Sequence, residues 1–223
     1  MSTALITGAA GGIGRELARQ LSERGTTVIA ACRKSSADLA DLPVRVEEGV
    51  DIATDAGCAA LAARLVGVPL DLVIHNAGVL TDESLGSLDA GAAARIRQQF
   101  EVNALAPLRL TALLAPQLAK GAKLALITSR MGSIADNTSG GYYGYRMSKA
   151  ALNAAGRSLA IDLAPRGVMV AMLHPGFVQT PMTGGRGDVD AATAARNLLA
   201  RIVELTPATS GGFLHANGSA LPW

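Results

Sequence analysis

Several residue types are scarce in this sequence of 223 residues, and each scarcity excludes a class of protein. Aromatic residues make up 3% and charged residues 17%, whereas hydrophobic residues make up 49%. Disordered chains are charged and poor in hydrophobic residues, so this composition predicts a folded chain with a large core. Because aromatics are rare, aliphatic side chains must build that core.

Excess charge of one sign is also lacking, with 20 basic and 18 acidic residues and a net charge of +2. Nucleic-acid-binding surfaces need clustered basic charge, so we expect no nucleic-acid partner. No apolar run approaches the ~20 residues that span a bilayer. Residues 1–8 lack the basic segment and long apolar stretch of a signal peptide. We therefore expect no membrane partner.

Cysteine is limited to Cys32 and Cys58, which lie far apart in the sequence. Such a pair indicates neither a disulfide framework nor a metal-binding knuckle, so we expect no metal site. Reduced thiols are typical of cytoplasmic proteins. The sequence therefore predicts a cytoplasmic location.

What the sequence does contain is a series of short apolar runs that alternate with helical patterns. Continuous apolar strands alternating with helices predict an α/β fold, here a single-domain Rossmann fold. We expect a doubly wound, mostly parallel seven-stranded sheet with helices on both faces. No repeat or linker divides the chain, so residues 1–223 are predicted as one domain. The predicted strands are 3–6, 27–31, 44–46, 70–74, 123–127, 168–173 and 212–215, and the predicted helices 13–24, 56–66, 92–118 (kinked at Pro107), 145–163 and 191–205.

A glycine-rich turn joins the first predicted strand to the first helix, with Gly8, Gly12, Ile13 and Gly14 in it. Gly8 permits the tight turn, Gly12 lets the backbone approach a pyrophosphate, and Gly14 allows close helix–strand packing. The helix N-terminus adds free N–H groups and a positive dipole end. The alternative is an ordinary tight turn, but the strand–turn–helix context favours a dinucleotide site.

Tyr145 and Lys149 are four residues apart in a predicted helix. Residues at this spacing share one helix face, so the hydroxyl and the ammonium can face one site. A free tyrosine has a pKa of about 10, and a nearby ammonium lowers it. This pair predicts a proton donor or acceptor, although single Tyr–Lys pairs also arise by chance.

Together these motifs make the chain resemble the short-chain dehydrogenase/reductase family, especially its C-factor-like and sniffer-like carbonyl reductase branch. The matching positions occur in order along nearly the whole chain. They are the glycine turn, Asp51 after the third strand, Asn76-Ala77-Gly78 after the fourth, Asn103, Ser129 after the fifth, Tyr145 with Lys149, and Pro175-Gly176 with Thr180 after the sixth.

The resemblance implies catalytic roles for four of these residues. Tyr145 would exchange a proton with the carbonyl or alcohol oxygen of a small-molecule substrate, and Ser129 would orient that oxygen. Lys149 would bind the nicotinamide ribose and lower the pKa of Tyr145, and Asn103 would hold a water in a proton relay. The reaction implied is hydride transfer between a nicotinamide cofactor and a carbonyl or alcohol.

The resemblance also implies cofactor contacts and an assembly. Asp51, with Ile52 beside it, would meet the adenine, and Asn76, Ala77 and Gly78 would line the adenosine side. Pro175, Gly176 and Thr180 would line the nicotinamide. Relatives are usually oligomers, so we expect a homodimer or homotetramer.

Two features depart from the family pattern. The spacing from Ser129 to Tyr145 is longer than usual, so Ser133 remains an alternative for orienting the substrate. The segment 181–187 is short and rich in glycine, which predicts an open, permissive substrate site.

The second strand ends in Ala-Ala-Cys32-Arg33-Lys34, which bears on the choice of cofactor. NAD enzymes of this fold usually place an acid here to bind the ribose 2′-hydroxyl, and by resemblance Cys32 occupies that slot. Arg33 can grip a 2′-phosphate through paired hydrogen bonds. We predict that NADPH is preferred. If Arg33 and Lys34 form only a solvated turn, NAD serves equally.

A second hypothesis comes from another class of protein. The chain would be a dinucleotide-binding signalling protein whose turnover is incidental. Intact Ser129, Tyr145 and Lys149 favour the enzyme.

Overall fold

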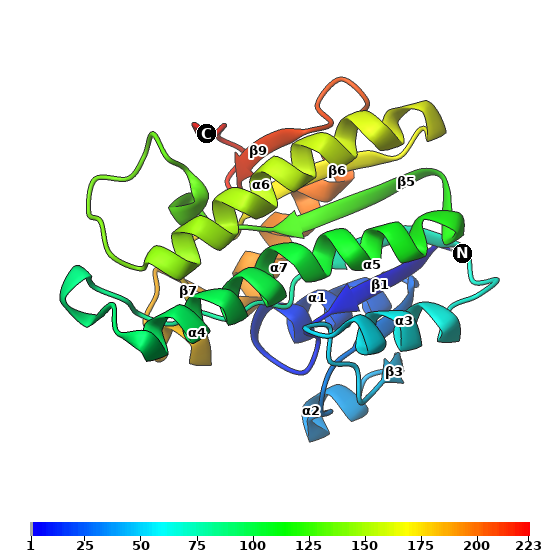
Figure 1. The fold of residues 1–223 in the computed structure, drawn as a ribbon. Helices are drawn as coiled ribbons and strands as arrows, with labels where there is room; N and C mark the ends of the chain where they lie inside the picture. Colours follow the sequence, from blue (N-terminus) through cyan, green and yellow to red (C-terminus); the bar gives the residue numbers. More distant parts are fainter. Residues whose placement is uncertain (1) are drawn as a thin grey trace.

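The computed structural model describes residues 2–223, which form one seven-stranded sheet and a small second sheet. All neighbouring strands of the large sheet are parallel, in the order β3-β2-β1-β4-β5-β6-β9 (Figure 1). Its strands are β1 (Thr3–Thr7), β2 (Thr27–Ala31), β3 (Arg45–Glu47), β4 (Leu70–His75), β5 (Leu118–Ile127), β6 (Met169–His174) and β9 (Gly212–His215). The predicted Rossmann-like sheet is confirmed.

Strand order reverses between β1 and β4. From β1 the chain builds outward to β3, and it then returns to place β4, β5 and β6 on the other side. In open α/β sheets the ligand site lies outside the carboxyl ends of the strands at such a reversal. The topology therefore locates the site near the ends of β1 and β4.

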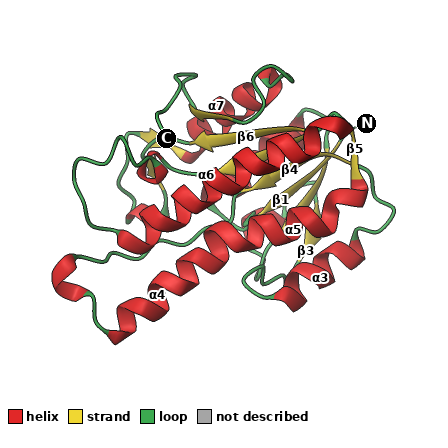
Figure 2. Ribbon diagram, turned by 45° about the horizontal axis from the view of Figure 1, so that its top comes forward, coloured by secondary structure: helices red, strands yellow, loops and turns green. Residues whose placement is uncertain are grey.

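Helices cover both faces of the sheet, as predicted (Figure 2). Buried residues of α3, α5 and α6 share one apolar core with the sheet, and buried residues of α1 and α7 share the other. Leu5 faces the first core and Ala4 and Ile6 the second, because successive strand residues point to opposite faces. The helices are α1 (Gly12–Glu23), α2 (Ala37–Ala40), α3 (Asp55–Arg64), α4 (Ala90–Phe100), α5 (Ala106–Leu114), α6 (Tyr143–Leu163) and α7 (Ala191–Glu204).

The single helix predicted over 92–118 is wrong. A π-helical turn, η2 (Glu101–Leu105), separates α4 from α5, and a 3-10 turn, η3 (Ala115–Gln117), leads into β5 at Leu118. Pro107 has no N–H to offer the carbonyl of Asn103 four residues earlier, and the helix widens at that point. Pro116 lies in the 3-10 turn, where the helical pattern ends.

Several short elements were not predicted. They include α2 and a pair of two-residue parallel strands, β7 (Val178–Gln179) and β8 (Val189–Asp190). This pair closes the segment between them into a loop containing the 3-10 turn η6 (Pro181–Thr183). Within residues 2–223, no helix combines the length and apolar character needed to cross a membrane.

Candidate active site

A cleft of about 700 Å³ lies where the carboxyl ends of the strands meet the N-terminal turns of the helices. Most of the predicted site residues line it. They are Gly8, Gly12, Ile13, Arg33, Asp51, Ile52, Asn76, Ala77, Gly78, Tyr145, Lys149, Pro175 and Thr180. Four predicted residues lie outside its lining, namely Gly14, Asn103, Ser129 and Gly176.

The glycine turn after β1 packs too tightly for side chains. Gly8 has φ +68°, and a Cβ there would lie 2.7 Å from the Cα of Ala77. A Cβ on Gly14 would lie 2.3 Å from the Gly8 carbonyl oxygen and 2.5 Å from Nδ2 of Asn76. Gly14 therefore acts behind the cleft, where it lets α1 approach the turn.

Asn76 fastens this turn to the end of β4. Its Nδ2 donates to the carbonyls of Thr7 and Gly8, both at 3.1 Å. The main-chain N–H groups of Asn76 and Ala77 donate to the Thr7 hydroxyl at 3.2 Å. Thr7 was not predicted as a site residue, but it fixes the geometry of both turns.

The N-terminus of α1 has no cap from its own side chains. Gly11 is the N-cap residue, and the first turn contains no acidic residue. Gly11, Gly12 and Ile13 line the cleft, so the unpaired N–H groups and the positive dipole end lie at its wall. This part of the cleft fits a pyrophosphate group.

Cations lie at the end of the cleft formed after β2. Arg33 and Lys34 are exposed and line the cleft, whereas the nearby acid Asp38 is paired with Arg15 at 2.7 Å. Cys32 is buried, and burial raises the pKa of its thiol, with Glu48 adding to the effect. An uncharged thiol therefore stands beside two cations. Asp51 is exposed on the same side, and its carboxylate accepts from the Ala53 N–H at 3.1 Å.

Tyr145 and Lys149 lie together on the buried face of α6, as their spacing predicts. Their exposed fractions are 8% and 4%, and Nζ of Lys149 lies 5.7 Å from the centre of the Tyr145 ring. Nζ donates to the carbonyl of Ile127, at the end of β5, at 2.8 Å. Ser129 follows β5, and its hydroxyl accepts from the Met131 N–H at 3.1 Å and lies near enough to Tyr145 to lower the pKa of the phenol.

Burial controls the protonation of both groups. It raises the pKa of Tyr145 to about 12, while the nearby Ser129 hydroxyl acts in the opposite direction. It lowers the pKa of Lys149 to about 8. The shift of Tyr145 runs against the lowering expected from Lys149. The ammonium is aimed at the Ile127 carbonyl, and the loss of water around the phenol disfavours the phenolate.

The hydroxyl of Ser133, the alternative to Ser129, forms hydrogen bonds away from Tyr145. It donates to the carbonyl of Trp223 at 3.2 Å and accepts from the Asp136 N–H at 3.1 Å. These bonds tie the loop after β5 to the last residue of the chain. Ser133 is thus held by the chain end, whereas the Ser129 hydroxyl lies near Tyr145.

Asn103 is fully buried in the π-helical turn η2. Its Oδ1 accepts from the Val79 N–H, and its Nδ2 donates to the Val79 carbonyl, both at 2.8 Å. The second N–H of Nδ2 donates to the Ser148 hydroxyl at 3.0 Å. The side chain therefore joins the loop after β4 to α6, one residue before Lys149.

Comparison with known proteins agrees with this geometry. The family described as short chain dehydrogenase matches residues 2–191. The chain is 47% identical to 1-hydroxy-2-glutathionyl-2-methyl-3-butene dehydrogenase of Rhodococcus sp. (strain AD45) over 100% of both chains. It is 46% identical to C-signal of Myxococcus xanthus over 74% of this chain and 99% of that protein.

The chain belongs to the short-chain dehydrogenase/reductase family. Its fold is also similar to the carbonyl reductase Sniffer of D. melanogaster, with a TM-score of 0.92 and 29% identity over 100% of both chains. An NADPH-bound carbonyl reductase from chicken fatty liver gives a TM-score of 0.90 at 28% identity, over 100% of this chain and 99% of that chain. This chain is thus an oxidoreductase of the short-chain dehydrogenase/reductase family.

Two predicted residues of this short-chain dehydrogenase/reductase, Gly176 and Thr180, follow β6 and differ in their relation to the cleft. Thr180 lines the cleft, and its Cγ2 would lie 3.3 Å from a Cβ placed on Gly12. Gly176 has φ +95° and faces the His215 ring, with 3.8 Å between its would-be Cβ and Nε2. Gly176 therefore turns the chain after β6 so that Pro175 reaches the cleft.

Sequence reasoning also missed a buried polar cluster of Thr81, Glu83 and Gln99 beside the start of α6. Glu83 and Gln99 are both fully buried. Glu83 lies in a polar loop, where a carboxylate is ordinarily solvated, so its type and position gave no signal. The one available clue was that the first turn of α6 has no cap of its own.

Proposed function

We propose that this protein transfers hydride between NADPH and a small carbonyl or alcohol substrate, with Tyr145 as the proton donor and acceptor. The observation that carries the proposal is the buried pair of Tyr145 and Lys149 in the lining of a cleft that the uncapped N-terminus of α1 also lines, with Ser129 near Tyr145. The bound nicotinamide would supply the hydride chemistry.

In the direction of reduction, Tyr145 acts as general acid. Its raised pKa keeps the phenol protonated near neutral pH. As negative charge develops on the substrate oxygen, the Tyr145 hydroxyl gives it a proton, and the Ser129 hydroxyl donates a hydrogen bond to the same oxygen. The phenolate left behind lies beside the Lys149 ammonium, which favours that charged form.

Different residues of the chain would bind different parts of the cofactor. The N–H groups at Gly11, Gly12 and Ile13 would hold the pyrophosphate, with Gly8 and Gly14 shaping the turn. Asp51 and Ile52 would meet the adenine, and Asn76 to Gly78 the adenosine side. Pro175, Gly176 and Thr180 would border the nicotinamide, and Lys149 would bind its ribose. Asn103 would hold the relay water through its main-chain carbonyl, because both N–H groups of its side chain are used.

The preference for NADPH rests on Arg33. An exposed guanidinium on the cleft wall, beside an uncharged Cys32, suits a 2′-phosphate and offers no carboxylate to a 2′-hydroxyl. Structural relatives with bound NADPH or NADP support this choice. NAD remains the alternative cofactor.

The same proposal covers the setting of the enzyme. It acts as a single domain over residues 1–223, in the cytoplasm, as a homodimer or homotetramer with no nucleic-acid or membrane partner. Both cysteines are free and buried, which is consistent with a reducing compartment.

The test is oxidation of NADPH against a panel of aldehydes, ketones, diketones and quinones, with the reverse reaction on the corresponding alcohols. Turnover of several unrelated carbonyls is expected, because the 181–187 segment is too short to build a deep lid. The glutathionyl alcohol named for the Rhodococcus relative belongs on the alcohol panel.

The similarity to C-signal favours a second candidate, a dinucleotide-binding signalling protein. Cofactor binding without turnover on the whole panel would favour this candidate over the enzyme.

A further inference from the structure

A fully buried carboxylate lies in the loop between β4 and α4. Glu83 is 0% exposed, and its side chain accepts three hydrogen bonds from neutral groups. The Thr81 hydroxyl donates at 2.5 Å, the Gln99 amide at 2.8 Å and the main-chain N–H of Gly144 at 3.1 Å. Among the ion pairs of residues 2–223, none involves Glu83. Burying a carboxylate is costly, and here only hydrogen bonds from neutral donors offset that cost.

The helix that Glu83 contacts cannot cap itself. α6 has 21 residues, its N-cap residue Tyr142 makes no side-chain capping bond, and its first turn contains no acid. Tyr142 also has φ +51°, a left-handed conformation that residues other than glycine rarely adopt. The free N–H groups and dipole of such a helix end attract a negative charge.

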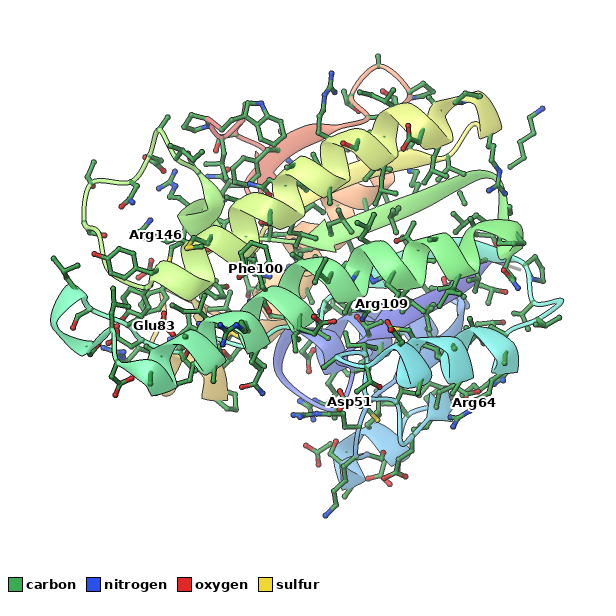
Figure 3. The ribbon with its side chains drawn as sticks, viewed as in Figure 1. Asp51, Arg64, Glu83, Phe100, Arg109 and Arg146 are labelled. Atoms are coloured by element: carbon green, nitrogen blue, oxygen red, sulfur yellow. The ribbon has the colours of Figure 1, made fainter. Side chains whose placement is uncertain are left out.

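Glu83 supplies that cap from 61 residues earlier in the sequence. Its carboxylate takes the Gly144 N–H, and its main-chain carbonyl takes the Tyr142 N–H at 2.7 Å. One residue thus binds two orphan donors and also fixes the strained Tyr142. Figure 3 shows Glu83 beside the first turn of α6, near Arg146.

Packing against α4 holds the same turn from a second side. A Cβ on Gly144 would lie 2.3 Å from Nε2 of Gln99 and 3.1 Å from the Cα of Ile96, so the backbones approach closely. Gln99 also accepts from the Thr81 N–H at 3.1 Å. The loop, α4 and α6 therefore meet around the Glu83 carboxylate.

Two hydrogen bonds to α6 each involve the residue that directly precedes a catalytic side chain. Glu83 binds Gly144, which precedes Tyr145, and Asn103 binds Ser148, which precedes Lys149. We propose that Glu83 is a positioning residue that fixes the first turn of α6 and thereby the Tyr145 hydroxyl relative to Ser129. This inference rests on the proposed function, because it assumes that Tyr145 acts on the substrate.

Glu83→Gln tests the inference, since it keeps the shape but turns an amide toward a set of donors. We expect kcat per NADPH-binding site to fall about 10- to 100-fold, the usual effect of misplacing a catalytic group by about 1 Å. The Kd for NADPH should stay unchanged, because Glu83 does not line the cleft. Hydrogen exchange should become faster in residues 143–147 and stay unchanged in the second half of α6.

Glu16→Gln is the matched control. Glu16 is also buried, at 7% exposed, but it pairs with Arg15 and Arg19 on α1 and lines no part of the cleft. Its kcat and the exchange of residues 143–147 should match those of the wild type. If Glu83→Gln does not fold, Glu83→Asp replaces it, because Asp keeps the charge but withdraws it from Gly144.

Tyr145→Phe, measured with the panel carbonyl that the wild type reduces fastest, separates the two claims. Turnover that survives in Tyr145→Phe contradicts the proposed function. Loss of turnover in Tyr145→Phe, with unchanged kcat in the Glu83 variant, contradicts only the role of Glu83. If the wild type reduces no carbonyl of the panel, the exchange measurement decides alone, and unchanged protection of residues 143–147 overturns the inference.

Discussion

At the scale of single residues, burial decides what Tyr145 and Lys149 can do. Their spacing predicts a shared face, and the structure shows it. Spacing cannot predict the directions of the pKa shifts, because those depend on the loss of water around each group. With its pKa raised to about 12, Tyr145 is protonated near neutral pH and is therefore ready to donate a proton.

Ser129 and Ser133 differ in what their hydroxyls already bind. Ser129 lies near Tyr145, whereas the Ser133 hydroxyl binds the carbonyl of Trp223 at the chain end. We expect Ser129→Ala to lower kcat about 100-fold or more, the usual effect of removing a donor to a developing oxyanion. Ser133→Ala should leave kcat nearly unchanged and slightly lower the unfolding temperature. Steady-state kinetics on both variants checks this, and a larger loss of kcat in Ser133→Ala would reverse the assignment.

Arg33 should discriminate between the two cofactors. Arg33→Ala removes a charge-assisted contact to the 2′-phosphate, typically worth about 1.5–3 kcal/mol, so kcat/KM for NADPH should fall roughly 10- to 150-fold. The value for NADH should hardly change. Arg24→Ala, at an exposed position at the end of α1, is the control. Equal losses with both cofactors would show that Arg33 forms only a solvated turn.

At the scale of elements, α6 is set against the sheet by a glycine. A Cβ on Gly156 would lie 2.4 Å from Sδ of Met172 and 2.7 Å from Cδ1 of Leu126. Gly156→Ala should therefore lower the free energy of unfolding by about 1–3 kcal/mol, as overpacking does. Gly86→Ala, with no heavy atom within 4 Å of its would-be Cβ, should change it little. Urea unfolding of both variants measures the difference, and equal stabilities would mean that α6 simply shifts.

Elements with a strong periodic pattern could be predicted from the sequence, and others could not. The strands at Thr27–Ala31 and Gly212–His215 have the predicted bounds, because continuous apolar runs are ended by polar turns. The π-helical turn η2 was missed, since hydrophobic periodicity continues through it. β7 and β8 depend on pairing between distant short segments, which no local pattern reveals. Glu83 was missed for the same reason, because its partner Gly144 is far away in sequence.

At the scale of the whole molecule, buried neutral histidine links stability to pH. His75 is 2% exposed, hydrogen-bonds the Thr111 hydroxyl at 2.9 Å, and has its pKa lowered by burial to about 4. The unfolded chain binds this proton near pH 6.5 and the folded chain does not, so stability is full above pH 6.5 and falls toward pH 4.

His75→Gln should remove part of that dependence. One proton corresponds to about 1.4 kcal/mol per pH unit, so His75 should account for up to about 2 kcal/mol between pH 6.5 and 5. His174, whose pKa is lowered to about 3, and His215, whose pKa is also lowered by burial, keep a slope of the same sign. Urea unfolding at both pH values tests this, and an unchanged slope in His75→Gln would show that His75 does not contribute.

Tyr145→Phe tests the central claim most directly, because it removes one hydroxyl and leaves the buried ring in place. General acid catalysis contributes about 10²- to 10⁴-fold, so kcat for NADPH-dependent carbonyl reduction should fall by at least about 100-fold. The Kd for NADPH, measured by fluorescence titration, should stay close to the wild-type value, because the hydroxyl acts on the substrate. A variant that keeps about a tenth or more of the wild-type kcat, well above that range, would contradict the assignment of Tyr145 as the proton donor.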